Sequence, residues 1–138
     1  MNLCPCGARG DPAAQCTCSG QRLAAYRDKL SRALLDRFDL VVTMPRPRAV
    51  ELAAGPSEAS AQVAPRVAAA RGRGGLSRTS DADELLSRAV ERLPLSGRGR
   101  ARVARTARTI AALAEAEAVA AEHVAEALAY RSPQELAA

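Results

Sequence analysis

The sequence predicts a mainly α-helical chain with a small residual α/β part. Three observations support this prediction. Apolar residues recur at helical spacing from residue 80 onward, one short run has the β-branched composition of a strand, and a stretch rich in proline and glycine separates the two. These features divide the chain into residues 1–44, a linker over residues 45–79, and a helical C-terminal domain over residues 80–138.

The first part is expected to end in a strand. Residues 21–35 carry leucines at helical spacing, and the apolar run of residues 40–44 follows them and is closed by Pro45 and Pro47. We expect a helix, a short second helix and then a buried strand. A fully apolar strand is typical of the interior of a parallel sheet, yet only residues 1–3 could pair beside this one. The pattern therefore predicts one or two strands from the end of a larger sheet.

Helices are expected in the other two parts. The linker contains four prolines and several glycines, with one possible helix over residues 59–71. The C-terminal part predicts three helices, over residues 80–93, 96–114 and 121–130, which can form a small bundle. The first begins with Ser80 and Asp83 in a capping-box-like pattern, and Pro94 ends it.

The middle helix of this bundle has two different faces. Val103, Ala107 and Ile110 share one face, and the opposite face carries Arg98, Arg102 and Arg105. By itself, an arginine stripe opposite an apolar stripe predicts a solvent-exposed surface. His123 is expected to be a surface residue of the last helix.

All the cysteines lie near the N-terminus, as two C-x-C pairs: Cys4, Cys6, Cys16 and Cys18. They could converge on one tetrahedral Zn²⁺, although C-x₂₋₄-C spacing is commoner in structural zinc sites. Two disulfides, or thiols that are idle or redox-active, are the alternatives. No signal peptide precedes the cysteines, so we expect a reducing, cytoplasmic setting, which disfavours disulfides.

Composition sets limits on the core and on the partners. Hydrophobic residues make up 48% of the chain but aromatic residues only 2%. Much of the apolar content is alanine, which favours helix but buries little surface, so we expect a thin core. The net charge of +5 suits polyanions, but an arginine-rich, alanine-rich composition is also typical of GC-rich genomes, so it supports nucleic-acid binding only weakly. No apolar stretch approaches the length of a membrane span.

A series of short motifs runs along nearly the whole chain. In order they are Asn2-Leu3-Cys4-Pro5-Cys6-Gly7, Gly10-Asp11-Pro12, Cys16-Thr17-Cys18, Tyr26, Leu34-Leu35-Asp36-Arg37-Phe38-Asp39-Leu40, Leu95-Ser96-Gly97-Arg98, Arg105-Thr106-Ala107-Arg108-Thr109-Ile110-Ala111, Glu122-His123-Val124-Ala125-Glu126-Ala127-Leu128 and Tyr130-Arg131. Together these motifs resemble the C-terminal part of the ComM, or magnesium-chelatase-like, AAA+ ATPases, and the cysteine cluster is similar to the ComM branch rather than to the chelatase subunits.

The resemblance implies a fold and three functional positions. The fold would be the end of an AAA+ core followed by a helical lid. Asn2 would be the sensor 1 residue, which helps to hold the water that attacks the γ-phosphate. Arg37 would be the arginine finger that a neighbouring subunit receives, and Arg98 the sensor 2 arginine of the lid. A permanently charged, forked guanidinium suits contact with phosphate oxygens. Arg102 and Arg105, on the same face as Arg98, could contact phosphate or the next subunit.

The sequence also lacks motifs that ATP hydrolysis needs. It has no G-x-x-x-x-G-K-[ST] loop and no Walker B acidic pair, so we expect the chain alone not to hydrolyse ATP. We expect it to be the product of a truncated reading frame or of a gene remnant. Full-length relatives would use ATP and Mg²⁺ as hexameric, DNA-processing motors of the helicase or branch-migration type. The alternatives are a small basic zinc-containing module that binds nucleic acid without ATP, and a remnant without independent activity.

Overall fold

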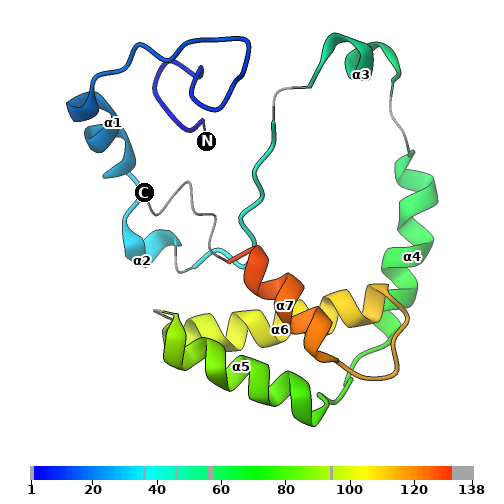
Figure 1. Cartoon of the computed structure of the whole chain (residues 1–138). Coiled ribbons are helices and arrows are strands. Elements are labelled where there is room, and N and C mark those ends of the chain that lie inside the picture. The colour runs from blue at the N-terminus through cyan, green and yellow to red at the C-terminus, as the bar shows by residue number, and fades with distance from the viewer. Residues whose placement is uncertain (1, 36, 46, 56–57, 94, 132–138) are drawn as a thin grey trace.

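The computed structural model describes residues 2–35, 37–45, 47–55, 58–93 and 95–131 (Figure 1). These residues form helices and connecting loops, with no strand among them, which confirms the prediction of a mainly helical chain. The helices of the described residues are α1 (Gly20–Arg27), α2 (Arg32–Leu35), α3 (Ala49–Ala53), α4 (Ser60–Gly72), α5 (Ser80–Arg92), α6 (Gly97–Leu113) and α7 (Ala121–Ala129). None of the helices described here is long and apolar enough to cross a bilayer.

The hydrophobic core lies between α5, α6 and α7, which lie together in Figure 1. Its largest fully buried side chains are Leu86 of α5, Val103 of α6, Val119 of the loop before α7 and Val124 of α7. Small alanines let the helices approach closely and complete the cluster: Ala82, Ala107, Ala111 and Ala127. The three predicted lid helices are thus confirmed as a bundle, and the core is as thin as the alanine content predicts.

The ends of these helices are set by side-chain caps. The Thr79 hydroxyl accepts a hydrogen bond from the Ala82 amide at 3.3 Å, and the Ser96 hydroxyl accepts one from the Gly99 amide at 3.0 Å. Thr79 therefore caps α5, and the predicted cap Ser80 is its first residue. The prediction was wrong by one position because Thr79 and Ser80 are both good caps, and Thr79 is fixed by its backbone bond to Val119.

One short backbone pairing and one arginine close the bundle. Arg78 and Val119 form an isolated parallel bridge, in which the Val119 amide donates to the Ser77 carbonyl at 2.8 Å. The guanidinium of Arg73, directly after α4, donates to the carbonyls of Glu115 at 2.7 Å and Ala116 at 3.2 Å. Since α4 also packs against α6, these contacts attach the end of the linker to the lid.

The predicted strand over residues 40–44 is not formed. These residues are extended but form no ladder of backbone hydrogen bonds with a second strand. The side chains of Leu40, Val42 and Met44 are 50%, 58% and 82% exposed. A strand needs a partner strand, and the described residues, including those near the N-terminus, offer none; the single backbone bond from the Val41 amide to the Tyr130 carbonyl is not a ladder. The sequence pattern also did not predict α3, a helix of five residues at the upper end of this part of the chain in Figure 1.

Candidate functional site

The four cysteines lie together in the N-terminal loop. Their sulfurs are all within 4.8 Å of one another, with 3.3 Å between the Cys4 and Cys6 sulfurs and 3.7 Å between those of Cys6 and Cys16. These distances are far longer than a disulfide bond, and the four cysteines are free thiols. The predicted convergence of the two C-x-C pairs is therefore confirmed.

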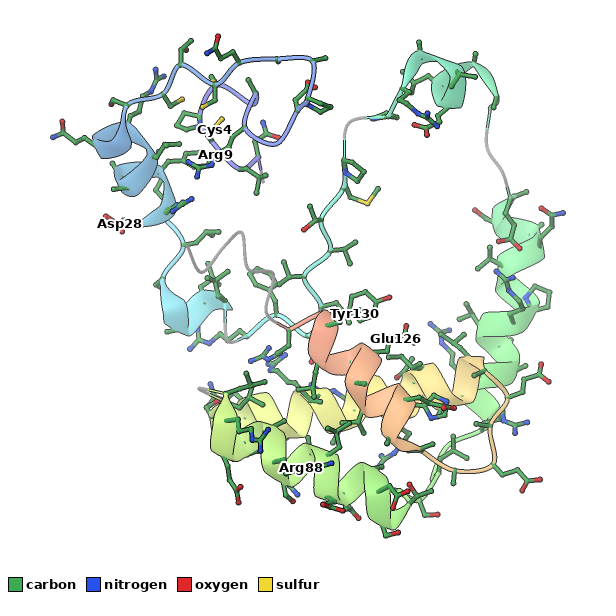
Figure 2. All side chains as sticks on the ribbon, viewed as in Figure 1. Cys4, Arg9, Asp28, Arg88, Glu126 and Tyr130 are labelled. Atoms are coloured by element: carbon green, nitrogen blue, oxygen red, sulfur yellow. The ribbon has the colours of Figure 1, made fainter. Side chains whose placement is uncertain are left out.

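The geometry of the thiols suits a tetrahedral metal ion. Four sulfurs bound at about 2.3 Å to one such ion lie about 3.8 Å apart, close to the separations seen here. Cys4 is fully buried, and the Arg9 amide donates to its sulfur at 3.3 Å. Figure 2 shows Cys4 and Arg9 near each other in the N-terminal loop. An amide directed at a sulfur stabilises the thiolate, which is the form that binds metal. Four cysteine thiolates are a donor set that zinc readily accepts.

Two glycines allow the loop to bring the thiols together. Gly7 and Gly10 have positive φ angles of 79° and 85°, a conformation that favours glycine. A Cβ added at Gly10 would meet Leu3 Cδ1 at 2.9 Å, so the Leu3 side chain would have to shift to make room for it. The Gly7 amide also donates to the Cys4 carbonyl at 3.1 Å, closing the turn after the first cysteine.

Two of the four thiols differ in acidity. A hydrogen bond from the Ala8 backbone, helped by Cys4 and Cys18, lowers the pKa of Cys6 from 9.0 to about 6. The backbone of Cys18 lowers the pKa of Cys16, but partial burial and the neighbouring thiols outweigh it and raise that pKa to about 11. A thiolate therefore forms more readily on Cys6 than on Cys16.

The predicted phosphate-sensing residues lie in three different parts of the chain, and only Asn2 is in the cysteine loop. Asn2 is exposed and lies beside Gly7, where an added Cβ would meet Asn2 Nδ2 at 3.5 Å. Arg37 follows α2, its amide donates to the Leu34 carbonyl at 2.9 Å, and its side chain is exposed. Asp36, the residue before it in the motif, lies outside the described residues. Among the described residues, no hydrogen bond or ion pair joins Asn2, Arg37 and Arg98.

The three arginines of α6 differ in their surroundings. Arg98, in the first turn, is exposed and has no ion pair within the part of the chain that the structure describes. Arg102 and Arg105 instead bind one oxygen of Asp39, Oδ1, at 2.9 Å and 2.7 Å. The Arg102 side chain is only 17% exposed, so the expectation of a solvent-exposed stripe was wrong for this residue. The hydrogen bond from Arg105 and the charge of Arg102 lower the pKa of Asp39.

Sequence reasoning missed two of these contacts. Asp39 was read only as part of a motif, and nothing local indicates that it binds a helix more than sixty residues away. His123 was expected on the surface but is only 7% exposed. Its Nδ1 accepts a hydrogen bond from the Ala120 amide at 2.9 Å, which caps the start of α7. Its place at the third helical position, where a capping side chain reaches back, was the available signal.

Two family models match the chain. The model described as "Magnesium chelatase, subunit ChlI" matches residues 1–52, and the one described as "Magnesium chelatase, subunit ChlI C-terminal" matches residues 73–131. The first range contains the cysteines, Asn2, Arg37 and Asp39, and the second contains Arg98. No solved structure matches the chain significantly.

Several uncharacterized bacterial proteins are similar in sequence. One from Mycobacterium tuberculosis (strain H37Rv) and one from Mycobacterium bovis are each 47% identical over 70 residues, which are 51% of this chain and 14% of each relative. YifB of Escherichia coli (strain K12) is 31% identical over 135 residues, covering 83% of this chain and 27% of YifB. The chain thus spans well under a third of the length of these relatives.

Proposed function

Since the chain belongs to the magnesium-chelatase-like, YifB-type proteins, we propose that it acts as the C-terminal part of a ComM-like AAA+ ATPase. In this proposal residues 1–44 are the end of the AAA+ core, residues 45–79 a linker and residues 80–138 the lid. The whole protein would be a ring of subunits, a hexamer by resemblance, that uses ATP and Mg²⁺ to process DNA in the cytoplasm.

Three residues carry the phosphate chemistry in this proposal. Arg37 reaches the nucleotide of the neighbouring subunit and stabilises the charge that develops on the transferred phosphoryl group. Arg98 contacts the γ-phosphate from the lid of its own subunit, and Asn2 orients the attacking water. The single observation that best supports these roles is that both guanidinium groups are exposed and form no ion pair with another described residue. A charged group already paired within its own chain would be a poor ligand for phosphate.

The cysteine cluster is proposed to hold one zinc ion that organises the N-terminal loop. Cys4, Cys6, Cys16 and Cys18 would be the ligands, and the close approach of their sulfurs supports this. Zinc bound by four thiolates leaves no open position for substrate, so the ion would be structural. Binding of the ion would require the four thiols to lose their protons, and it would fix a loop that otherwise has little apolar packing.

The experiment tests the two arginines in one chimera. The 138 residues replace the corresponding C-terminal segment of E. coli YifB, which supplies the rest of the protein, and ATP hydrolysis is measured. We expect Arg37→Ala to abolish turnover, by about a thousandfold or more, with little loss of ATP binding. Arg98→Ala should weaken nucleotide binding as well as turnover.

The matched control is Arg100→Ala, because Arg100 is also exposed and lies on the same helix. It should leave hydrolysis within about twofold, since a single exposed charge away from the phosphate changes little. A chimera that hydrolyses ATP equally well without Arg37 would contradict the finger assignment. A chimera that never hydrolyses ATP would contradict the proposal that this chain completes the ATPase.

A second candidate is a small zinc-containing module that binds nucleic acid without ATP, and the thiol cluster together with the +5 charge favours it. Titration of labelled DNA with the 138-residue chain separates the two. We expect weak binding that fades from low to physiological salt, because two tyrosines and one phenylalanine offer no stacking platform and only phosphate neutralisation remains. Sub-micromolar binding at physiological salt would favour the module instead.

A further inference from the structure

The segment that carries Arg37 is attached to the lid at several points. Asp39 Oδ1 forms ion pairs with the guanidinium groups of Arg102 and Arg105 of α6, at N–O distances of 2.9 Å and 2.7 Å. Because these two arginines are three residues apart on a helix, both point from the same face, and one carboxylate oxygen can meet both. Asp39 is only two residues after Arg37, so this contact restrains the loop that presents the Arg37 side chain.

Two backbone contacts reinforce the attachment on either side of Asp39. The Arg131 guanidinium donates to the Phe38 carbonyl, and the Val41 amide donates to the Tyr130 carbonyl at 2.9 Å. We call residues 37–40 the finger segment. Figure 2 shows Tyr130 at the end of α7, beside the extended chain that follows this segment. We call the bonds made by Phe38, Asp39 and Val41 to α6 and to the end of α7 the finger clamp.

None of the described residues of this segment belongs to the hydrophobic core of the bundle. Among the described elements, α1, α2 and α3 make no substantial packing contact with the bundle. Phe38 and Leu40, which flank Asp39, are 47% and 50% exposed, so neither is part of the hydrophobic core. The position of the Arg37 loop relative to α6 therefore depends on the polar bonds of the clamp.

We propose that Asp39 is a positioning residue that fixes the Arg37 loop to α6, so that Arg37 and Arg98 move as one rigid unit. Arg98 begins the same arginine stripe, one turn before Arg102, so a shift of α6 at Arg98 is carried to the finger through Asp39. The meaning of this link for catalysis rests on the proposed function. In that case the clamp couples the sensor that reads a subunit's own nucleotide to the finger that enters its neighbour's site.

The test measures rigid-body motion in the 138-residue chain by NMR, without nucleotide. Residual dipolar couplings of the amides of Arg37, Phe38 and Leu40 are compared with those of α6. In the unchanged chain all should fit one alignment tensor. In Asp39→Asn, which keeps the size but loses the charge, the finger segment should need a separate tensor and the Val41 amide should exchange with solvent about tenfold faster or more.

Further variants separate positioning from general stability. Asp39→Glu should restore the single tensor because it returns the carboxylate. Glu91→Gln removes an exposed carboxylate of α5 and should change neither readout. Arg105→Gln, at a side chain that is 63% exposed, should loosen the finger segment without leaving a buried charge unpaired. In all these variants the exchange of the core amides of Leu86 and Val103 should stay within about twofold, since the clamp lies outside the core.

A single tensor that persists in both Asp39→Asn and Arg105→Gln would overturn the inference. Loss of core protection together with the finger segment would also count against it, because Asp39 would then serve stability rather than position. The result is independent of the chimera experiment. If the clamp behaves as expected but Arg37→Ala hydrolyses ATP normally, the proposed function fails while the mechanical link stands.

Discussion

The N-terminal region, residues 2–55, and the bundle region, residues 76–131, are held together by different forces. Among the described residues, every buried side chain of the second region lies in or beside the α5–α6–α7 bundle, whereas Cys4 is the buried hydrophobic residue of the first. Val42, Met44 and Leu52 of the N-terminal region are all more than half exposed. A region with an apolar core can fold by itself, but a region without one depends on a metal or on polar attachment to its neighbour.

The largest expected effect contrasts the same substitution in the two regions. Leu86→Ala removes a fully buried side chain from the core and should lower the free energy of unfolding by about 2–5 kcal/mol, through lost burial and the cavity left behind. Leu40→Ala, at a side chain that is 50% exposed, should change it by less than about 0.5 kcal/mol. Thermal and urea unfolding followed by circular dichroism measures both. Equal effects would mean that the two regions share one core.

A smaller effect contrasts two helix caps. Thr79 caps α5 of the bundle and Ser19 caps α1, each through a side-chain oxygen that accepts an amide hydrogen bond at 3.3 Å. Thr79→Ala should cost about 1 kcal/mol of lid stability, because α5 unfolds with the core. Ser19→Ala should leave the cooperative unfolding transition unchanged, since α1 has no buried residues. A shift of that transition by Ser19→Ala would show that α1 folds as part of the bundle.

The bundle region was also the more predictable of the two, because it has an apolar core. Its helices repeat apolar residues with the period of a helix buried on one side, and polar caps mark their ends, so all three were located to within one or two residues. The convergence of the thiols was also predictable from local spacing. The extended run at residues 40–44 was misread as a strand because composition indicates a preference for pairing but not whether a partner is present.

Contacts between distant residues could not be predicted from one sequence. The pairing of Asp39 with Arg102 and Arg105 joins segments with no shared periodicity. The sequence of α6 alone therefore predicted a solvent-exposed helix surface for the arginine stripe. The roles of Asn2, Arg37 and Arg98 came from the family resemblance alone, and they stay predictions.

The smallest expected effect concerns pH. The hydrogen bond from Arg105, with the charge of Arg102, holds the pKa of Asp39 below its ordinary value of 3.8. A lowered pKa in the folded chain means that the bond contributes fully above the ordinary value and is lost only as the pH falls through the lowered one. Because Asp39 is 48% exposed, solvent screening limits this contribution to less than about 1 kcal/mol.

An NMR titration of the Asp39 carboxyl group should therefore have its midpoint below pH 3.8. The hydrogen bond from the Val41 amide to the Tyr130 carbonyl should persist from neutral pH down to that range. In Arg105→Gln the midpoint should move up toward the ordinary value, because the largest stabilising bond is lost. A midpoint at or above 3.8 in the unchanged chain would contradict the clamp as an ion pair in solution.

The contrast between the regions is tested most directly by hydrogen exchange of the whole chain with and without zinc. Zinc content is measured first, and about one ion per chain is expected. Chelation should then abolish protection around the Arg9 amide, which donates to the Cys4 sulfur, while the amides of Leu86, Val103 and Val124 keep theirs. Less than about a tenth of an equivalent of zinc after reconstitution, or loss of protection throughout the lid on chelation, would contradict the account.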